Sequence, residues 1–164
     1  CLSDWSSDVC SSDLHKARAD VVAYKLGVGL DAPGLVLAKS HSYMNESGGP
    51  IKALCNFYKI EKENLIVIHD ELDIPFNSIR IKQGGGDNGH NGLKSTTSAL
   101  GADYYRIRMG IGRPAGEQDP ADFVLKNFSS AEKSELQDFI SRGGDAIEYL
   151  IRNGLTAAQG AYNQ

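Results

Sequence analysis

The 164-residue sequence has few cysteines, no long apolar run and no excess of positive charge. Its three cysteines, Cys1, Cys10 and Cys55, show neither an even-numbered disulfide framework nor metal-ligand spacing, so we expect reduced thiols in a cytoplasmic protein. No apolar stretch approaches the roughly 20 residues of a membrane-spanning helix, which argues against a membrane protein. The net charge of −4 argues against a protein that coats nucleic acid indiscriminately.

Motifs of several enzyme classes are also missing. The sequence has no Gly-x-Ser-x-Gly nucleophile elbow, and none of its His, Cys and Asp residues cluster at zinc-ligand spacing. A hydrolase built on this chain would therefore use water, with no metal or other cofactor. Its candidate bases are the four histidines, His15, His41, His69 and His90.

Composition and length fit one ordinary globular domain, with 41% hydrophobic and 23% charged residues. The first fourteen residues differ, because Ser6-Ser7-Asp8-Val9-Cys10 is nearly repeated in Ser11-Ser12-Asp13-Leu14 without helical or strand periodicity. We interpret residues 1–14 as a non-native or disordered segment. Residues 15–164 are then a single domain.

Hydrophobic periodicity predicts alternating strands and helices along the rest of the chain. The apolar run over 65–68 is typical of a strand buried on both faces, and Ser129 with Glu132 resembles a capping box. The predicted elements are strands over 21–26 and 35–38 joined by a hairpin-like loop, a helix over 50–58, strands over 65–68 and 78–82, a helix over 92–100, a strand over 105–111, and two helices after Ser129, the second following Gly143-Gly144 and ending near Gly154. This order favours an α/β three-layer sandwich with a mixed, mostly parallel sheet flanked by helices.

The glycine-rich loop over 84–92 is the most unusual segment. Its glycines permit positive φ and close approach to a ligand, and His90 and Asn91 add a titratable group and an amide where a helix begins. The loop fails the phosphate-loop pattern, because Leu93-Lys94 follows the last glycine, and it fails the dinucleotide fingerprint as well. A flexible connector and a ligand-binding loop both remain open.

Polar side chains follow the buried strand at His69 and Asp70. Neighbouring residues on a strand point to opposite faces, so these two side chains cannot pair with each other. Asp70 could orient a histidine elsewhere, or it could be a helix cap or turn former. Asn45 is either a turn residue or a substrate-binding amide.

Positive charge is concentrated between Arg80 and Arg113. This stretch holds six cations and two anions, a net charge of +4, so the remainder carries −8. A solvated basic face and an RNA-binding patch both explain it.

Four segments together resemble bacterial-type peptidyl-tRNA hydrolase, in the order and at the spacing of that family. They are Lys39 to Asn45, His69-Asp70-Glu71-Leu72-Asp73, the loop from Gly84 to Lys94, and Arg106 to Pro114. The resemblance runs from about His15 to the end of the chain. It implies a monomeric enzyme of translation and ribosome rescue that hydrolyses the ester between a peptide and the 3′ end of tRNA.

The resemblance also implies roles for seven residues around one groove. Asp70 keeps the catalytic histidine basic, and His90 lies at the same cleft. Asn45 and Asn91 hydrogen-bond the peptide and the 3′ end of the tRNA, and Tyr43 lines the cleft. Lys82 and Arg108 hold phosphates of the tRNA, on a basic ledge beside the groove.

The family opens with a strand, a Gly-Asn-Pro-Gly loop and a Tyr…Thr-Arg-His-Asn stretch that brings the general base, and none of these occurs before Lys39. We therefore expect a chain that lacks the catalytic histidine and a central strand, and that is poorly stable and nearly inactive. The alternative is a non-catalytic RNA-binding protein on the same fold, using Lys82, Arg106 and Arg108.

Overall fold

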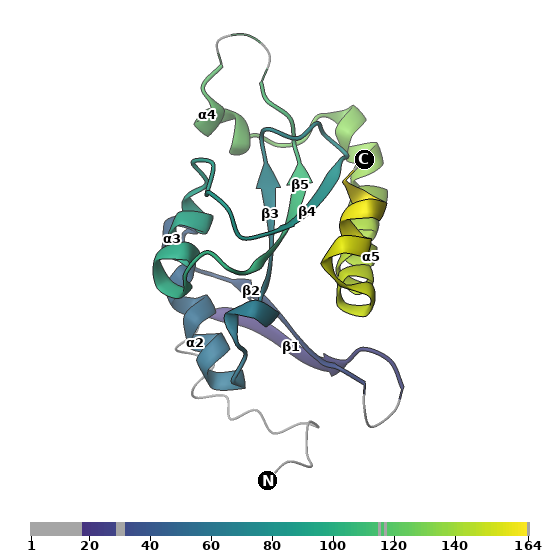
Figure 1. Cartoon of the computed structure of the whole chain (residues 1–164). Helices are drawn as coiled ribbons and strands as arrows, with labels where there is room; N and C mark the ends of the chain where they lie inside the picture. The colour runs from purple at the N-terminus through teal and green to yellow at the C-terminus, as the bar shows by residue number, and fades with distance from the viewer. Residues whose placement is uncertain (1–17, 29–31, 115, 117, 164) are drawn as a thin grey trace. The chain divides into compact units, whose positions relative to one another are not determined.

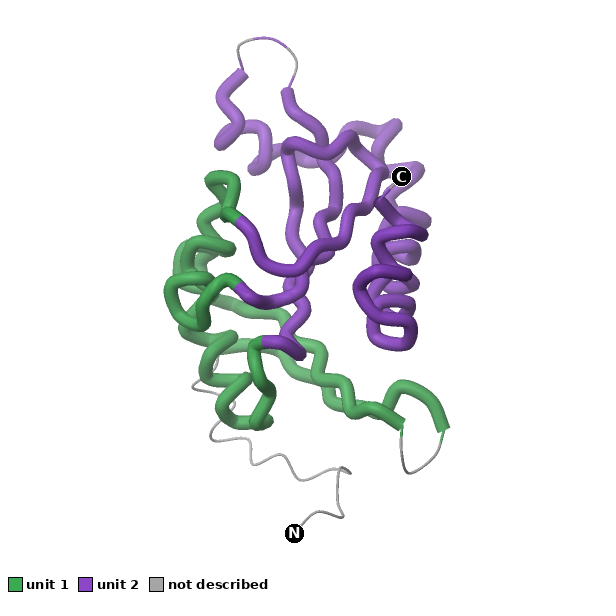
Figure 2. Tube along the Cα trace, in the orientation of Figure 1, with its two compact units in different colours: residues 1–62, 86–102 green, residues 63–85, 103–164 purple. Residues whose placement is uncertain are grey.

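The computed structural model describes residues 18–28, 32–114, 116 and 118–163. The chain divides into two compact units, each made of two separate stretches (Figure 2). Unit 1 holds Cys1–Lys62 and Gly86–Ala102, and unit 2 holds Glu63–Gly85 and Asp103–Gln164. The segment 1–14, which we interpreted as non-native, lies outside the described residues.

Unit 1 contains the predicted hairpin. Strands β1 (Ala19–Lys25) and β2 (Gly34–Ser40) pair antiparallel, with Ala19 opposite Ser40 and Lys25 opposite Gly34. The backbone N–H of Leu26 donates to the carbonyl of Pro33 at 2.9 Å, which extends the pairing by one bond beyond the strands. A short connection between strands permits only the antiparallel arrangement, so the hairpin prediction is confirmed.

The helices of unit 1 pack closely against each other. A 3₁₀ turn, η1 (Met44–Glu46), leads into α2 (Gly48–Tyr58), and α2 packs on α3 (Asn91–Leu100), as Figure 1 shows. A Cβ on Gly48 would collide with the carbonyl oxygen of Ser95, and the Gly48 N–H donates to the Ser95 hydroxyl at 3.0 Å. Cys55 on α2 is buried, and burial raises the pKa of its thiol, as expected for a core residue.

Unit 2 is a three-stranded sheet with a long helix against it. The strands β3 (Ile66–Glu71), β4 (Ile79–Gln83) and β5 (Tyr105–Gly110) lie in the order β3-β5-β4, and helix α5 (Ser130–Tyr162) packs on β4 and β5 (Figure 1). The core side chains are Ile79, Ile81 and Ile107 from the sheet and Phe139, Ala146, Leu150 and Ala158 from the helix. Two further elements, the 3₁₀ turn η2 (Lys62–Asn64) and helix α4 (Pro120–Val124), were not predicted.

The α/β class and the mixed sheet are confirmed, but parallel pairing does not dominate among the described strands. β3 runs parallel to β5, whereas β4 is antiparallel to β5 and β1 is antiparallel to β2. The parallel pair is separated in sequence by β4 and α3, because parallel strands need a long crossover. The short connection between β1 and β2 leaves only the antiparallel arrangement, whereas β4 and β5 are antiparallel although α3 lies between them.

Helix α5 begins where the capping box predicts and continues where a break was expected. Ser129 Oγ accepts from the Glu132 N–H, Glu132 accepts from the Ser129 N–H, and these bonds hold the pKa of Glu132 below its usual range. The predicted break at Gly143-Gly144 is wrong, because the helix is interrupted instead at Gly154, with φ of 78°. A Cβ on Gly143 would lie 3.0 Å from Met109 Cε, so this glycine lets the helix approach β5.

Side-chain amides near the end of α5 cover the outer edge of β4. The Ile81 N–H donates to Asn163 Oδ1 at 2.6 Å, and the Ile81 carbonyl accepts from Asn163 Nδ2 at 2.9 Å and from Gln159 Nε2 at 3.1 Å. An edge strand carries backbone groups that lack a neighbouring strand. Asn163 supplies the acceptor and donor that such a strand would present.

Replacing Asn163 by alanine tests this edge contact. The change removes two hydrogen bonds to fully buried Ile81, so we expect the free energy of unfolding to fall by about 1–3 kcal/mol. Urea unfolding followed by circular dichroism measures it. Asn153→Ala is the control, because its amide bonds only the Tyr149 carbonyl on an exposed turn of the same helix, and it should change stability by less than about 0.5 kcal/mol. Equal losses in both variants would contradict the edge role.

Candidate functional site

The start of helix α3 in unit 1 is capped by a histidine. His90 Nδ1 accepts hydrogen bonds from the backbone N–H groups of Gly92 at 3.1 Å and Leu93 at 3.2 Å. Because a protonated Nδ1 cannot accept, the proton of the neutral ring is on Nε2. The Asp87 carboxylate accepts from the Thr97 hydroxyl at 2.8 Å, and the Asp87 carbonyl accepts from the His90 N–H at 2.8 Å, so the loop is tied to the helix it precedes.

Turn η1 brings a second polar group to this end of α3. The two elements pack together, and a Cβ on Gly92 would lie 2.5 Å from Met44 Sδ, so Met44 occupies the space that the glycine leaves. Asn45 follows Met44 in η1, and Asn91 is the first residue of α3. Both asparagines are exposed, and neither side chain hydrogen-bonds another residue in the described part of the chain. Their amides are therefore available to a ligand.

The glycine-rich loop before α3 adopts the backbone conformations that its composition predicts. Gly84, Gly85 and Gly89 have φ of 66°, 94° and 79°. Residues that carry a side chain rarely adopt such φ values, so these positions favour glycine.

Unit 2 presents a basic sheet face on the side away from α5. Side chains alternate along a strand, so Ile79, Ile81 and Ile107 face the core and the residues between them face the opposite side. Arg80 is opposite Arg108 and Lys82 is opposite Arg106 across β4 and β5. Four cations therefore share one face, which places much of the predicted positive charge on a single surface of this unit.

The four cations differ in their availability. Arg106 is fully buried, donates to the Gly85 carbonyl at 2.9 Å and stacks on the Tyr104 ring, with 4.7 Å between the guanidinium carbon and the ring centroid. Arg106 therefore supports the sheet, and the alternative of an RNA-binding surface that used it is disfavoured. Lys82 is half-buried, and a Cβ on Gly85 would lie 2.9 Å from its ammonium nitrogen, so this glycine leaves room for the ammonium.

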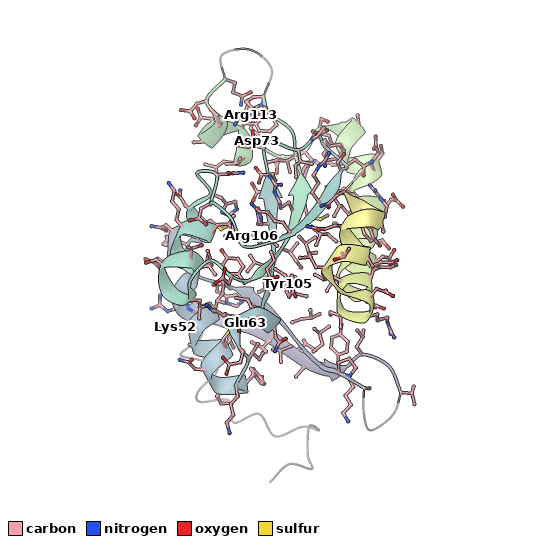
Figure 3. All side chains as sticks on the ribbon, viewed as in Figure 1. Lys52, Glu63, Asp73, Tyr105, Arg106 and Arg113 are labelled. Atoms are coloured by element: carbon pink, nitrogen blue, oxygen red, sulfur yellow. The ribbon has the colours of Figure 1, made fainter. Side chains whose placement is uncertain are left out.

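Arg108 pairs with an acidic residue that the sequence analysis did not single out. Its Nε donates to Glu71 Oε2 at 3.1 Å, its Nη2 forms an ion pair with the same oxygen at 3.0 Å, and the Glu71 side chain is only 7% exposed. Strand alternation offered a signal, because Glu71 lies one residue after Asp70 and so shares the face of His69 and Arg108. A second ion pair, Arg113 with Asp73, is exposed and therefore contributes little to the free energy of folding (Figure 3).

Asp70 lies inside β3, in register with Met109 of β5. The interpretation of Asp70 as a turn former or helix cap is therefore wrong. His69 and Glu71 are buried whereas Asp70 is half-buried and Ile68 is 52% exposed, in agreement with the predicted opposite faces. His69 Nδ1 lies 2.7 Å from the Asp70 carbonyl, a contact to the backbone and not to the carboxylate.

The predicted site residues divide between the two units. Asp70, Lys82 and Arg108 belong to unit 2. The others, Tyr43, Asn45, His90 and Asn91, belong to unit 1, where they gather on η1, the residue before it and the start of α3. Convergence of the two sets on one groove stays a prediction. Across the described ranges, no three His, Cys, Asp or Glu residues are placed to hold a metal ion, and no helix is long and apolar enough to span a membrane.

The described residues thus form an α/β protein with two exposed amides in unit 1 and four cations on one sheet face of unit 2. Comparison with known proteins makes the class specific, because the peptidyl-tRNA hydrolase family model matches residues 6–164. Peptidyl-tRNA hydrolases of Arthrobacter sp. (strain FB24) and Streptomyces coelicolor are 51% and 54% identical over 154 and 153 residues, which cover 93% and 90% of this chain and 78% and 74% of theirs. The chain belongs to the peptidyl-tRNA hydrolase family.

Solved structures agree with this assignment. The crystal structure of peptidyl-tRNA hydrolase from Acinetobacter baumannii is similar with a TM-score of 0.78 and 29% identity, over 90% of this chain and 75% of that one. The family match begins at residue 6, before His15, where we expected the resemblance to begin. It therefore gives no support to the expectation that the N-terminal and catalytic segments of the family are missing.

Substitution of His90 tests its role as the cap of helix α3. His90→Ala removes the acceptor for two backbone N–H groups, so we expect the free energy of unfolding to fall by about 1 kcal/mol. His90→Asn should recover most of that loss, since asparagine is a favoured cap. His41→Ala is the control, because its pairing with Asp20 is exposed. Urea unfolding in which His90→Asn is as unstable as His90→Ala would rule out the cap as the source of the stabilisation.

Proposed function

We propose that this chain acts on peptidyl-tRNA through the seven residues named above, and that the reaction is attack of water on the ester between the peptide and the tRNA 3′ end. The observation that carries the proposal is the family match over residues 6–164, together with the uncommitted amides beside the start of α3. Water attack on an ester needs groups that hold the ester, hold the RNA and accept a proton. We assign the first two roles to described residues.

Asn45 and Asn91 suit the peptide end of the substrate. An amide offers a donor and an acceptor together, which matches a substrate that contains ester and amide groups side by side. Tyr43 precedes η1 and is 80% exposed, so its ring can line the same surface.

Lys82 and Arg108 suit the tRNA end. They lie on neighbouring strands of one sheet face, and phosphate contacts of this kind position RNA without reading its sequence. An ammonium and a guanidinium close together favour a phosphate of the acceptor stem. Binding of this kind is local, which is compatible with the net charge of −4 of the whole chain.

The proton acceptor is the remaining group, and we assign it to none of the described histidines. His41 Nε2 pairs with Asp20 at 2.8 Å on the exposed hairpin, His69 is buried against its own strand, and His90 Nδ1 caps α3. We propose that Asp70 orients a general-base histidine that is not among them. A missing general base costs about a hundredfold to ten-thousandfold in rate.

Turnover of this chain tests the assignment of the base. We expect release of peptide from an N-acyl-aminoacyl-tRNA to be more than about tenfold slower than with the Streptomyces coelicolor relative, because a general base contributes more than that. Single-turnover kinetics with excess protein measure the chemical step directly. A rate within tenfold of the relative would contradict the expectation that the general base is missing, and would leave His15 or one of the described histidines as the base.

Substrate binding tests the amides independently of turnover. The probe is a tRNA whose 3′ ester is replaced by an amide, measured by fluorescence anisotropy. We expect Asn45→Ala and Asn91→Ala each to weaken binding about tenfold, the scale of one or two lost hydrogen bonds. The control, Asn56→Ala, removes an exposed asparagine of α2 in the same unit and should leave affinity unchanged. Equal affinity of all three variants would exclude the asparagines from the site.

A further inference from the structure

The Arg108–Glu71 pair is an unusual arrangement for a cation that is to bind RNA. Both donors, Nε and Nη2, converge on the same carboxylate oxygen, Oε2, and the two side chains are 17% and 7% exposed. The other oxygen, Oε1, accepts from the Asp73 N–H at 3.3 Å. The carboxylate is therefore held by its own strand end while it holds the guanidinium.

The guanidinium has two edges that can take an oxyanion, and Glu71 occupies one of them. The Nε and Nη2 atoms form the side edge, and the Nη1 and Nη2 atoms form the end edge. Apart from the contact of Nη2 with Glu71, no hydrogen bond or ion pair joins the end edge to a residue of the described ranges. A second oxyanion can thus bind end-on while the side edge stays paired.

Charge alone does not account for Glu71 in this position. A carboxylate beside a phosphate-binding cation lowers the attraction for RNA, and burying an ion pair has a desolvation cost. Glu71 instead fixes the side chain of Arg108, which lies directly opposite Arg80 and would otherwise be repelled by it. A guanidinium fixed in this way binds a planar pair of oxygens with less loss of conformational entropy.

We propose that Glu71 is a positioning residue, which holds Arg108 by its side edge so that the end edge faces a phosphate of the RNA backbone. The inference rests on the proposed function, because it takes Arg108 as a phosphate-binding cation. It adds a fourth residue to the unit 2 set and gives that residue a role through Arg108 rather than through direct contact with the substrate.

The sign of the effect of Glu71 substitutions tests the inference. The probe is a 5′-phosphorylated RNA minihelix that reproduces the tRNA acceptor stem, bound to the full chain and followed by fluorescence anisotropy. If Glu71 positions Arg108, Glu71→Met weakens binding about tenfold although the net charge rises by about one unit. Glu71→Gln keeps an oxygen acceptor for Arg108 and therefore weakens RNA binding less than Glu71→Met does. If Glu71 acts only through its charge, both variants bind more tightly, and that result overturns the inference.

Arg108→Met separates this inference from the proposed function. It should weaken binding and reduce the slope of log affinity against log salt by about 1, the value for one lost phosphate contact. The double variant with Glu71→Met should bind no more weakly than Arg108→Met alone. An Arg108→Met variant with unchanged affinity and slope would remove Arg108 from the proposed site, whereas weakening by Arg108→Met together with unchanged or tighter binding by Glu71→Met would reject the positioning role alone. Should Glu71→Met not fold by circular dichroism, the sign of the Glu71→Gln effect decides.

Discussion

Side-chain alternation along β4 and β5 is the constraint on which unit 2 depends. Ile79, Ile81 and Ile107 must point toward α5 to bury a core, so the residues between them must point away. Those residues are arginines and a lysine. The same two strands therefore build the hydrophobic core on one face and a basic surface on the other, and a one-residue change of register would exchange the two.

A basic sheet face needs partners for its cations, because like charges on neighbouring strands repel each other. Each of the three arginines is held by a different partner. Arg80 donates to the Asn163 carbonyl at 3.0 Å, Arg106 to the Gly85 carbonyl, and Arg108 to the Glu71 carboxylate. The edge of the sheet, the glycine-rich turn and the neighbouring strand thus each fix one guanidinium. Stability of the sheet and the placing of charge for a ligand come from the same contacts.

In unit 1 the start of α3 serves both structure and chemistry. Histidine is an unusual cap, since serine, threonine, aspartate and asparagine are the favoured residues. His90 uses Nδ1 for the cap, and the side-chain amides of Asn45 and Asn91 bond no other residue in the described part of the chain. Gly92 and Gly48 matter here because a side chain at either position would push η1 or α2 away from α3.

The local elements and the family can be read from the amino-acid sequence. Periodicity, the hairpin, the Pro50 helix and the Ser129–Glu132 box depend on residues a few positions apart, and the structure agrees with each. Short motifs also sufficed for the resemblance that the comparisons bear out. The placement of Lys82 and Arg108 on one sheet face needed the register of β4 against β5 as well as strand alternation.

Tertiary structure decided which of the polar residues are committed. Arg106 and Arg108 are two positions apart and look alike in sequence, yet one is fully buried and the other keeps an open edge. Glu71 meets Arg108 across 37 positions and Asn163 meets Ile81 across 82, and Gly143 continues a helix because Met109 packs against it. Such pairings carry no local signal, because they form only when distant strands and helices pack.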